Sequence, residues 1–257
     1  MNEASLEQDF LRLLQEQGWQ HLTGAELTER GLREDVREAI LAPVLAEALP
    51  ASACSQASQE LIRTARTPKL LEANAQLWQL LIEGVPVEYQ QEGRTQHKQA
   101  QVLDWAEPPN NHLLAVRQLT IQGLKGEKRP DVVLYVNGLP LAVVELKSAL
   151  PDPANEEQAS LEAAYHQLQG YIRRIPALFP FASVLAITDG YTAKVGSLTA
   201  NWERYQPWKL RRKDVGAHKA EVMDMLGYEA LARGPLSPVT LLELTRSFSV
   251  LETPVGK

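Results

Sequence analysis

The chain has 257 residues, of which 44% are hydrophobic and 23% charged, and its formal net charge is −6. This composition is typical of a folded globular protein and excludes a disordered chain. The apolar runs fall well short of the roughly 20 residues that cross a bilayer, and the acidic N-terminus lacks the apolar core of a signal peptide. We therefore expect a cytoplasmic protein with no membrane partner. The single cysteine, Cys54, excludes an intramolecular disulfide and a cysteine-based zinc site.

The apolar periodicity predicts helices first, then mainly strands, then a mixture of both. Apolar residues at helical spacing predict helices at residues 5–17, 34–48 and 69–82, with a loop at 51–58. After Gly84, alternation with a period of two predicts strands at residues 85–89, 101–105, 113–122, 131–136 and 141–147. The remaining predicted elements are a helix at 155–175, a strand at 183–188 and helices at 217–232 and 238–248.

These elements predict an α/β (α+β) fold in which helices flank a mixed central sheet, with a helical C-terminal tail. We expect a helical part at residues 1–84 that packs on a core at residues 85–214. Residues 215–257 are expected to form the tail.

Three ionisable residues stand at one end of a predicted pair of apolar strands. Asp131 opens the first strand, and Glu145 and Lys147 lie two apart on the second. Two carboxylates and the carbonyl of Leu146 are the hard oxygen ligands that suit Mg²⁺, and an adjacent ammonium can stabilise developing negative charge. Such a site can hydrolyse a phosphodiester. The alternative is a hairpin whose end charges are solvated, with Lys147 paired with a carboxylate, because short patterns of this kind recur by chance.

The register of this strand pair decides whether the two carboxylates can meet. A two-residue turn at Asn137-Gly138 places Asp131 opposite Val144, so that Asp131 and Glu145 point to opposite faces. A three-residue loop that ends at Leu139 places Asp131 opposite Glu145 instead. The nuclease interpretation therefore predicts an odd-length loop or a compensating bulge. In that register, one face carries the three ionisable residues together with Val133, Tyr135, Leu141 and Val143.

The run Arg129–Lys147, RPDVVLYVNGLPLAVVELK, closely resembles the nuclease motif of the restriction (R, or HsdR) subunits of type I restriction-modification enzymes. These subunits belong to the PD-(D/E)xK nuclease superfamily. The likeness covers roughly residues 85 to 212. It includes Val102–Trp105 and Pro109–His112 upstream, and Ile187–Gly190, Lys194–Thr199 and Arg204–Lys209 downstream.

The resemblance implies a role for each residue that matches the family pattern. Asp131 and Glu145 would be metal ligands, with the Leu146 carbonyl, and Lys147 the catalytic lysine. The cofactor would be Mg²⁺, for which Mn²⁺ would substitute.

Two further family elements are matched outside the core motif. The family's QxxxY element is matched by Gln167 and Tyr171, which share a helix face because they are four residues apart. The alternative for this pair is a packed helix surface. Glu7 is the candidate for the glutamate that related nucleases carry on their first helix.

The resemblance also implies partners. Double-stranded DNA would be the substrate, and the methylation (M) and specificity (S) subunits would complete the restriction complex. The chain contains no Gly-x-x-x-x-Gly-Lys-Ser/Thr sequence, so ATP would act only through a motor domain that this chain lacks. We expect an N-terminal fragment of the subunit. The rival hypotheses are a noncatalytic assembly or DNA-clamping module and a solitary repair or junction-resolving nuclease.

The net negative charge is unfavourable for DNA binding, so basic residues should gather on one face or another subunit should deliver the DNA. Lys209–Lys213 is the densest basic run, and its part from Arg211 to Lys213 is interpreted as a solvated loop in preference to a DNA contact. The candidates for phosphate contacts are Lys125, Lys128, Arg129, Arg173 and Arg174.

Overall fold

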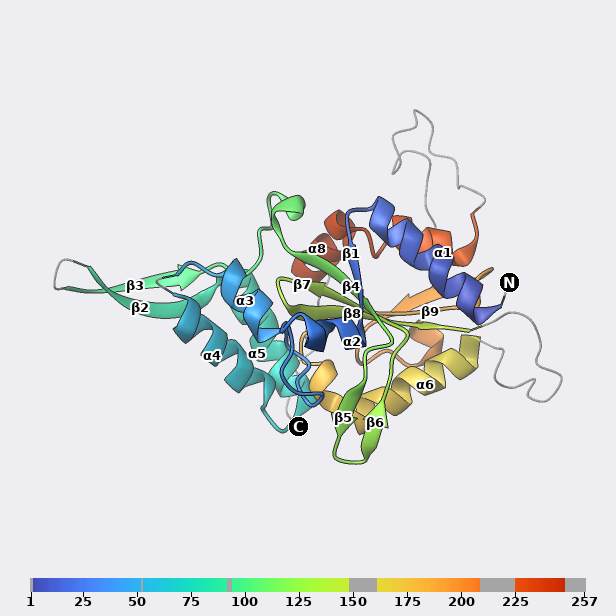
Figure 1. Ribbon diagram of the computed structural model, residues 1–257, viewed down its shortest axis with the longest axis horizontal. Coiled ribbons are helices and arrows are strands. Elements are labelled where there is room, and N and C mark those ends of the chain that lie inside the picture. The colour runs from blue at the N-terminus through green and yellow to red at the C-terminus, as the bar shows by residue number, and fades with distance from the viewer. Residues whose placement is uncertain (1, 52, 92–93, 148–160, 209–224, 248–257) are drawn as a thin grey trace, which may run out of the picture.

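The computed structural model describes residues 2–51, 53–91, 94–147, 161–208 and 225–247 (Figure 1). Its centre is a six-stranded sheet in the order β1-β4-β7-β8-β9-β10. The pairs β1–β4 and β8–β9 are parallel and the other pairs antiparallel, so the sheet is mixed, as predicted. The strands are β1 (Gln20–Thr23), β4 (Leu113–Arg117), β7 (Val132–Val136), β8 (Leu139–Leu146), β9 (Val184–Thr188) and β10 (Ala193–Gly196).

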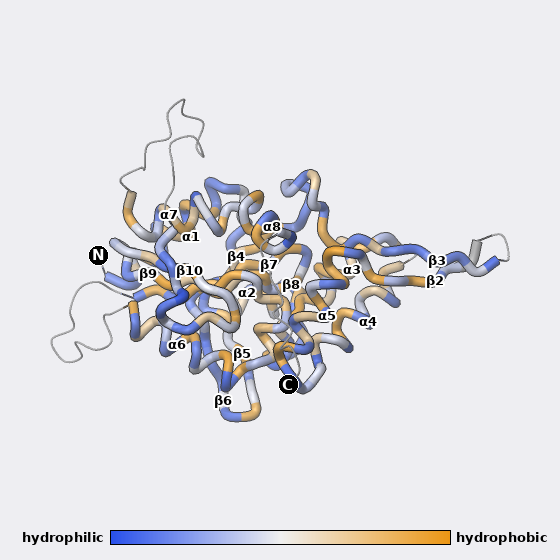
Figure 2. The backbone as a smooth tube through the Cα atoms, turned by 180° about the vertical axis from the view of Figure 1, so that it is seen from behind, coloured by the Kyte–Doolittle hydropathy of each residue, from blue (hydrophilic) through white to orange (hydrophobic). Residues whose placement is uncertain are grey.

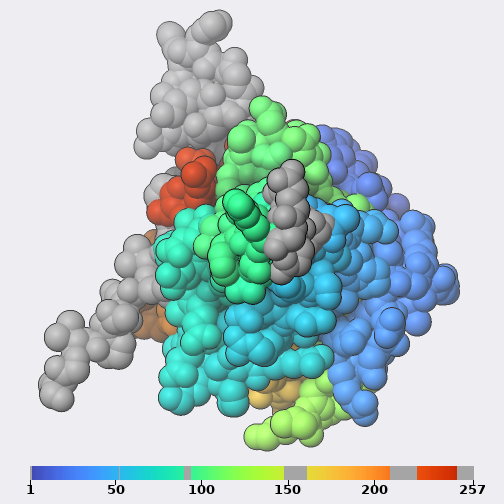
Figure 3. Space-filling view, turned by 90° about the vertical axis from the view of Figure 1, so that its left-hand side faces the viewer, coloured from blue at the N-terminus to red at the C-terminus, as the bar shows by residue number. Residues whose placement is uncertain are grey.

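Two separate hairpins extend from this body (Figure 1). The longer one pairs β2 (Val85–Gln91) with β3 (Arg94–Ala100), and its outer end faces the viewer in Figure 3. The shorter one pairs β5 (Ile121–Gly123) with β6 (Gly126–Lys128) and precedes β7 directly.

Helices cover both faces of the sheet (Figure 1). One buried cluster joins the sheet to α1, α4, α5, α7 and α8, and a second joins its other face mainly to α6, with α2 beside it. The helices are α1 (Glu3–Glu16), α2 (Gly24–Glu29), α3 (Ala42–Ala48), α4 (Cys54–Ala65), α5 (Leu70–Glu83), α6 (Leu161–Arg174), α7 (Gly227–Arg233) and α8 (Pro238–Ser247). Within the described ranges, every helix is too short or too polar to cross a membrane.

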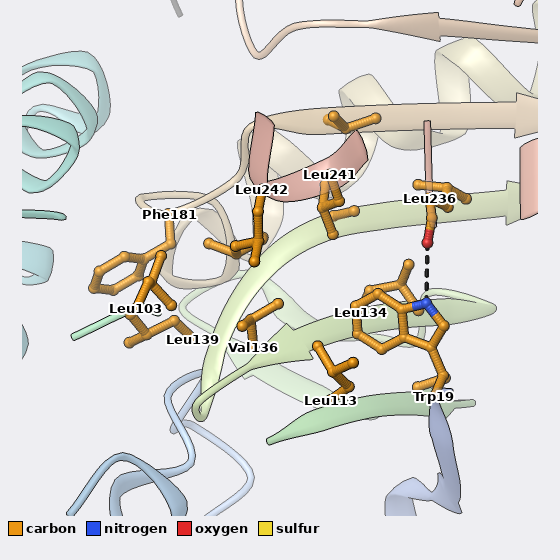
Figure 4. Packing of buried hydrophobic residues seen from close by; sticks show 14 of the residues in the cluster. Trp19, Leu103, Leu113, Leu134, Val136, Leu139, Phe181, Leu236, Leu241 and Leu242 are labelled. Atoms are coloured by element: carbon orange, nitrogen blue, oxygen red, sulfur yellow. Dashed lines mark hydrogen bonds between the residues drawn. The ribbon is translucent and has the colours of Figure 1, made fainter. Parts of the chain in front are cut away.

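The central strands β7 and β8 are buried along their whole length, and Figure 2 shows them as largely hydrophobic. Along β7, Leu134 belongs to the first cluster and Val133 and Tyr135 to the second, which is the alternation expected of a strand covered on both sides. In the first cluster the buried Trp19 indole donates a hydrogen bond to the Leu236 carbonyl at 3.0 Å (Figure 4). This bond ties the start of the chain to its C-terminal helices.

Several predicted elements are confirmed, and several are wrong. The predicted segment 34–48 is helical only from Ala42. The preceding loop is irregular because the buried Arg33 guanidinium donates hydrogen bonds to the carbonyls of Val36, Glu38 and Thr120. The predicted loop 51–58 is also wrong, because α4 begins at Cys54 and buries its small residue Ala57 against the core.

The strand predicted at 101–105 is wrong as well. This segment is irregular, and the strand is β3, whose exposed polar residues give no hydrophobic alternation. The strand predicted at 113–122 is divided at Gln118, where φ is +52°. The short strands β1 and β10 were not predicted. Of the helices predicted at 155–175 and 217–232, residues 155–160 and 217–224 lie outside the described residues.

Candidate active site

The turn between β7 and β8 contains two residues, Asn137 and Gly138, which adopt φ values of +50° and +80°. Positive φ at both positions is the requirement of a type I′ hairpin turn. The Asn137 side chain is buried, accepting from His112 N at 2.7 Å and donating to Val102 O at 2.8 Å. A Cβ atom on Gly138 would lie 2.5 Å from the Leu41 carbonyl oxygen. The predicted three-residue loop is therefore wrong, and packing fixes the shorter turn.

A β-bulge compensates for the short turn. Tyr135 pairs with Pro140, but the next residue, Leu134, pairs with Ala142, so Leu141 is an extra residue on β8. Leu141 packs in the first cluster and not on the Tyr135 face, where the sequence predicts it. Without the bulge, every residue beyond it would face the wrong side of the sheet. The compensating bulge is thus confirmed.

Beyond the bulge, Val132 pairs with Val144, and continuing this register places Asp131 opposite Glu145. Asp131 lies one residue before β7 and is only 7% exposed. Its Oδ2 accepts a hydrogen bond from the Leu146 N–H at 2.7 Å, and its carbonyl accepts one from Gln118 N at 2.9 Å. Asp131 is therefore fixed to the strand that carries the second acid.

Glu145 is fully buried, and its Oε1 accepts a hydrogen bond from Lys147 Nζ at 2.9 Å. Its other oxygen, Oε2, is buried without a hydrogen bond of good geometry among the described residues, although the nearby Tyr171 hydroxyl interacts with the same carboxyl group and lowers its pKa. A buried carboxylate oxygen without a well-placed donor is unfavourable, and a hard cation would satisfy it. The site residues present therefore fit a divalent metal ion.

Both carboxyl groups have raised pKa values. Burial raises the pKa of Glu145 to about 8, and the charge of Asp131 adds to the rise. Burial also raises the pKa of Asp131 to about 6, although the hydrogen bond from Leu146 opposes this. For Lys147, burial by itself would lower the pKa, but the Glu145 ion pair and the Asp131 charge outweigh it and the pKa is raised. The site thus disfavours two adjacent negative charges and keeps the lysine protonated.

Helix α6 crosses from β8 to the parallel strand β9 and presents Gln167 and Tyr171 to this site. Gln167 Nε2 donates to the Tyr171 hydroxyl at 2.5 Å, and that hydroxyl donates to the Arg129 carbonyl at 3.4 Å. Burial raises the pKa of Tyr171, as does the charge of Glu145, so the hydroxyl stays a donor. The structure brings this pair beside the acids, although Tyr171 also packs in the second cluster.

Glu7 lies near the acids but is held by other partners. Its carboxylate contacts Arg117 Nη1 at 3.3 Å and accepts a hydrogen bond from Gln118 Nε2 at 2.7 Å. These three residues and Glu3 line a groove of about 940 Å³, and the charges of Glu3 and Glu7 add to the raised pKa of Asp131. Among the described residues, no three acidic, histidine or cysteine side chains gather as metal ligands. Glu7 as a ligand stays a prediction.

Three neighbours of the site were not predicted from the sequence: Glu3, Arg117 and Gln118. Glu3 shares the exposed face of α1 with Glu7 because the two are four residues apart. Gln118 is placed by a left-handed backbone conformation at the end of β4, which no periodicity signals.

The predicted phosphate contacts fall in two groups that the fold brings together. Lys125, Lys128 and Arg129 lie on or just after the β5–β6 hairpin, whereas Arg173 and Arg174 end α6. Gly123 of the hairpin packs on the carbonyl of Arg174, so the groups are adjacent. The basic run 209–213 lies outside the described residues.

Comparisons with known proteins identify the family of this chain. The family described as "Type I restriction enzyme R protein N terminus (HSDR_N)" matches residues 1–204. The HindI endonuclease subunit of a type I restriction enzyme from Haemophilus influenzae is 35% identical over 273 residues, covering 100% of this chain and 25% of that protein. A protein named as the MjaIXP endonuclease subunit, from Methanocaldococcus jannaschii, is 26% identical over 235 residues, covering 85% of this chain and 22% of that protein.

The chain thus spans a quarter or less of the length of these curated relatives. Their likeness nevertheless extends over the whole of the site, from α1 to β10. The chain belongs to the family of type I restriction enzyme R protein N termini.

Proposed function

We propose that this chain is the nuclease region of a type I restriction subunit and that it hydrolyses phosphodiester bonds of double-stranded DNA with a divalent metal ion. The observation that carries the proposal is the approach of Asp131 and Glu145 across the bulged hairpin, with Lys147 bonded to Glu145. Burying two acids beside one ammonium lowers the stability of the fold. Such groups are typically retained where a function requires them.

Asp131, Glu145 and the carbonyl of Leu146 would hold the cation. The Leu146 N–H points toward Asp131, and the carbonyl of the same residue in an extended strand points to the same side. Mg²⁺, or Mn²⁺ in its place, suits these oxygen ligands, and when bound it polarises a phosphate oxygen and acidifies a water.

The remaining residues of the candidate site would stabilise charge on the phosphate or hold the metal ligands in place. Lys147 is protonated and partly buried, so it would stabilise the negative charge that develops on the phosphate. Tyr171, supported by Gln167, fixes the backbone at Arg129, two residues before Asp131. These two are positioning residues in this scheme.

The family resemblance also carries proposals about the whole enzyme. We propose that cleavage depends on ATP through a motor domain, occurs in a complex with M and S subunits, and takes place in the cytoplasm. The two rival hypotheses, a noncatalytic assembly module and a solitary nuclease, predict different results in the following experiment.

The test is nicking of supercoiled plasmid DNA by the complete chain in its assembled complex, with Mg²⁺ and ATP. We expect Lys147→Ala to lower the cleavage rate about a hundredfold or more, because a charge-stabilising donor is removed. Lys194→Ala is the matched control, since Lys194 lies 3.9 Å over the Trp202 ring and not at the site. Equal cleavage by wild type and Lys147→Ala would support the noncatalytic alternative, and ATP-independent cutting of junctions would support the solitary nuclease.

A further inference from the structure

The tip of the β5–β6 hairpin carries an unusual side chain. Leu124 is fully exposed there, more so than the other large hydrophobic residues of the described ranges. A leucine held in water at the end of a projecting loop loses the stabilisation that burial would give. A single exposed leucine is common on protein surfaces, so the surroundings of Leu124 decide whether it marks a contact with another molecule.

The residues at the start of the β5–β6 hairpin are packed and hydrogen-bonded against the body of the protein. Ile121 is fully buried, and Gln122 N donates to the Val36 carbonyl at 2.9 Å. A Cβ atom on Gly123 would lie 2.0 Å from the Arg174 carbonyl oxygen, so the hairpin packs directly on the end of α6. Both Figure 1 and Figure 3 show the hairpin protruding from the body. The tip is thus held at a fixed place relative to the candidate active site.

The tip is also narrow. Gly123 pairs with Gly126, so only Leu124 and Lys125 carry side chains at the turn. Gly126 has φ +95°, a conformation that favours glycine. The major groove of DNA is about 12 Å wide and admits a whole two-stranded ribbon, whereas the minor groove is about 6 Å wide and is entered by single apolar side chains such as leucine.

Positive charge exceeds negative charge around this tip, where Glu127 is the one acidic residue of the hairpin. Lys125, Lys128 and Arg129 lie on or beside the hairpin, and the exposed Arg173-Arg174 pair ends the helix on which it packs. None of these five forms an ion pair with a described residue. Unpaired cations around an apolar tip match a groove bordered by phosphates.

We propose that Leu124 enters the minor groove of double-stranded DNA while the surrounding cations bind the phosphates on either side. This inference rests on the proposed function and names how the substrate is held. The strand that follows the tip leads through Arg129 to Asp131, and the six residue steps from Lys125 to Asp131 span at most about 22 Å. The hairpin therefore fixes the duplex beside the candidate active site.

The test is binding of the complete chain to a fluorescent duplex in EDTA, which prevents metal-dependent cleavage, at several salt concentrations. We expect Leu124→Ser to weaken binding about fivefold or more without changing the salt dependence, because an apolar contact releases no counterions. Lys125→Ala should instead reduce the slope of log affinity against log salt by about one. Leu71→Ser is the matched control, because Leu71 is an exposed leucine on α5.

A minor-groove ligand such as netropsin provides an independent measurement. It should displace wild type and have less effect on Leu124→Ser. The inference would be overturned if Leu124→Ser and Leu71→Ser bound the duplex with equal affinity. It would also be overturned if netropsin displaced these two variants equally. Either result leaves Lys147-dependent cleavage intact, so failure of this inference is distinct from failure of the proposed function.

Discussion

The backbone N–H of Leu146 donates a hydrogen bond to Asp131 Oδ2 at 2.7 Å. Leu146 follows Glu145 directly, so the strand that carries one acid also fixes the other. The bond uses one oxygen of Asp131, while Oε2 of Glu145 is left without a hydrogen bond of good geometry among the described residues. The electrostatic properties of the site can therefore be tested residue by residue.

Glu145→Gln should change how stability depends on pH. The folded-state pKa of Glu145 is raised from 4.5 to about 8, so between these values the folded protein binds more protons than the unfolded one. Stability of the metal-free protein should fall as pH rises through this window. In EDTA, thermal unfolding of wild type should show this fall between pH 5 and pH 8.5.

Because glutamine cannot ionise, Glu145→Gln buries no negative charge as pH rises and should be the more stable protein at pH 8.5, by a few kcal/mol at most. The control is Glu162→Gln, an exposed acid on α6 whose substitution should leave the wild-type profile unchanged. Parallel profiles for wild type and Glu145→Gln would contradict the raised pKa.

Mg²⁺ should raise the melting temperature of wild type through preferential binding to the folded state. At a Mg²⁺ concentration one hundred times its Kd, the free energy of unfolding increases by about 2.7 kcal/mol. Asp131→Asn should lose most of this gain, and Glu162→Gln should keep it. Because protons compete for Glu145, the effect in wild type should shrink toward pH 5. Scanning calorimetry with and without Mg²⁺ measures it, and an equal gain in Asp131→Asn would rule out Asp131 as a ligand.

Gly138→Ala should destabilise the protein more than its backbone conformation alone requires. Both Gly138 (φ +80°) and Gly31 (φ +67°) are left-handed, but a Cβ atom on Gly138 would meet the Leu41 carbonyl oxygen at 2.5 Å, whereas Gly31 has open space. We expect Gly31→Ala to cost about 1 kcal/mol and Gly138→Ala about 2–4 kcal/mol in urea unfolding. Similar losses in the two variants would show that the turn is not held by packing on Leu41.

Tyr171→Phe should lower cleavage about tenfold, since it removes the hydroxyl that bonds Gln167 and the Arg129 carbonyl. Stability should change by no more than about 1 kcal/mol, because the ring stays buried. Tyr165→Phe is the control on the same helix, where the ring packs on Trp202 and Tyr205. Plasmid nicking in the assembled complex compares the two. Unchanged cleavage by Tyr171→Phe would leave this tyrosine with a packing role only.

The sequence by itself determined those features that depend on neighbours along the chain. The apolar runs predict β7 and β8, and four-residue spacing places Gln167 and Tyr171 on one face of α6. The need for an odd-length loop or a bulge also follows from the sequence. Side chains alternate along each strand, so at their spacing Asp131 and Glu145 can share a face of the sheet only in one of these two ways.

The tertiary structure decided what depends on segments remote in sequence. The bulge at Leu141 forms in place of a longer loop because Gly138 packs on Leu41, nearly a hundred residues earlier in the chain. Glu7 is bonded to Gln118, 111 residues away, so its orientation was unpredictable from α1 alone. Local periodicity reports burial and backbone conformation, whereas such contacts arise only when separate elements compete for the same space and the same hydrogen bonds.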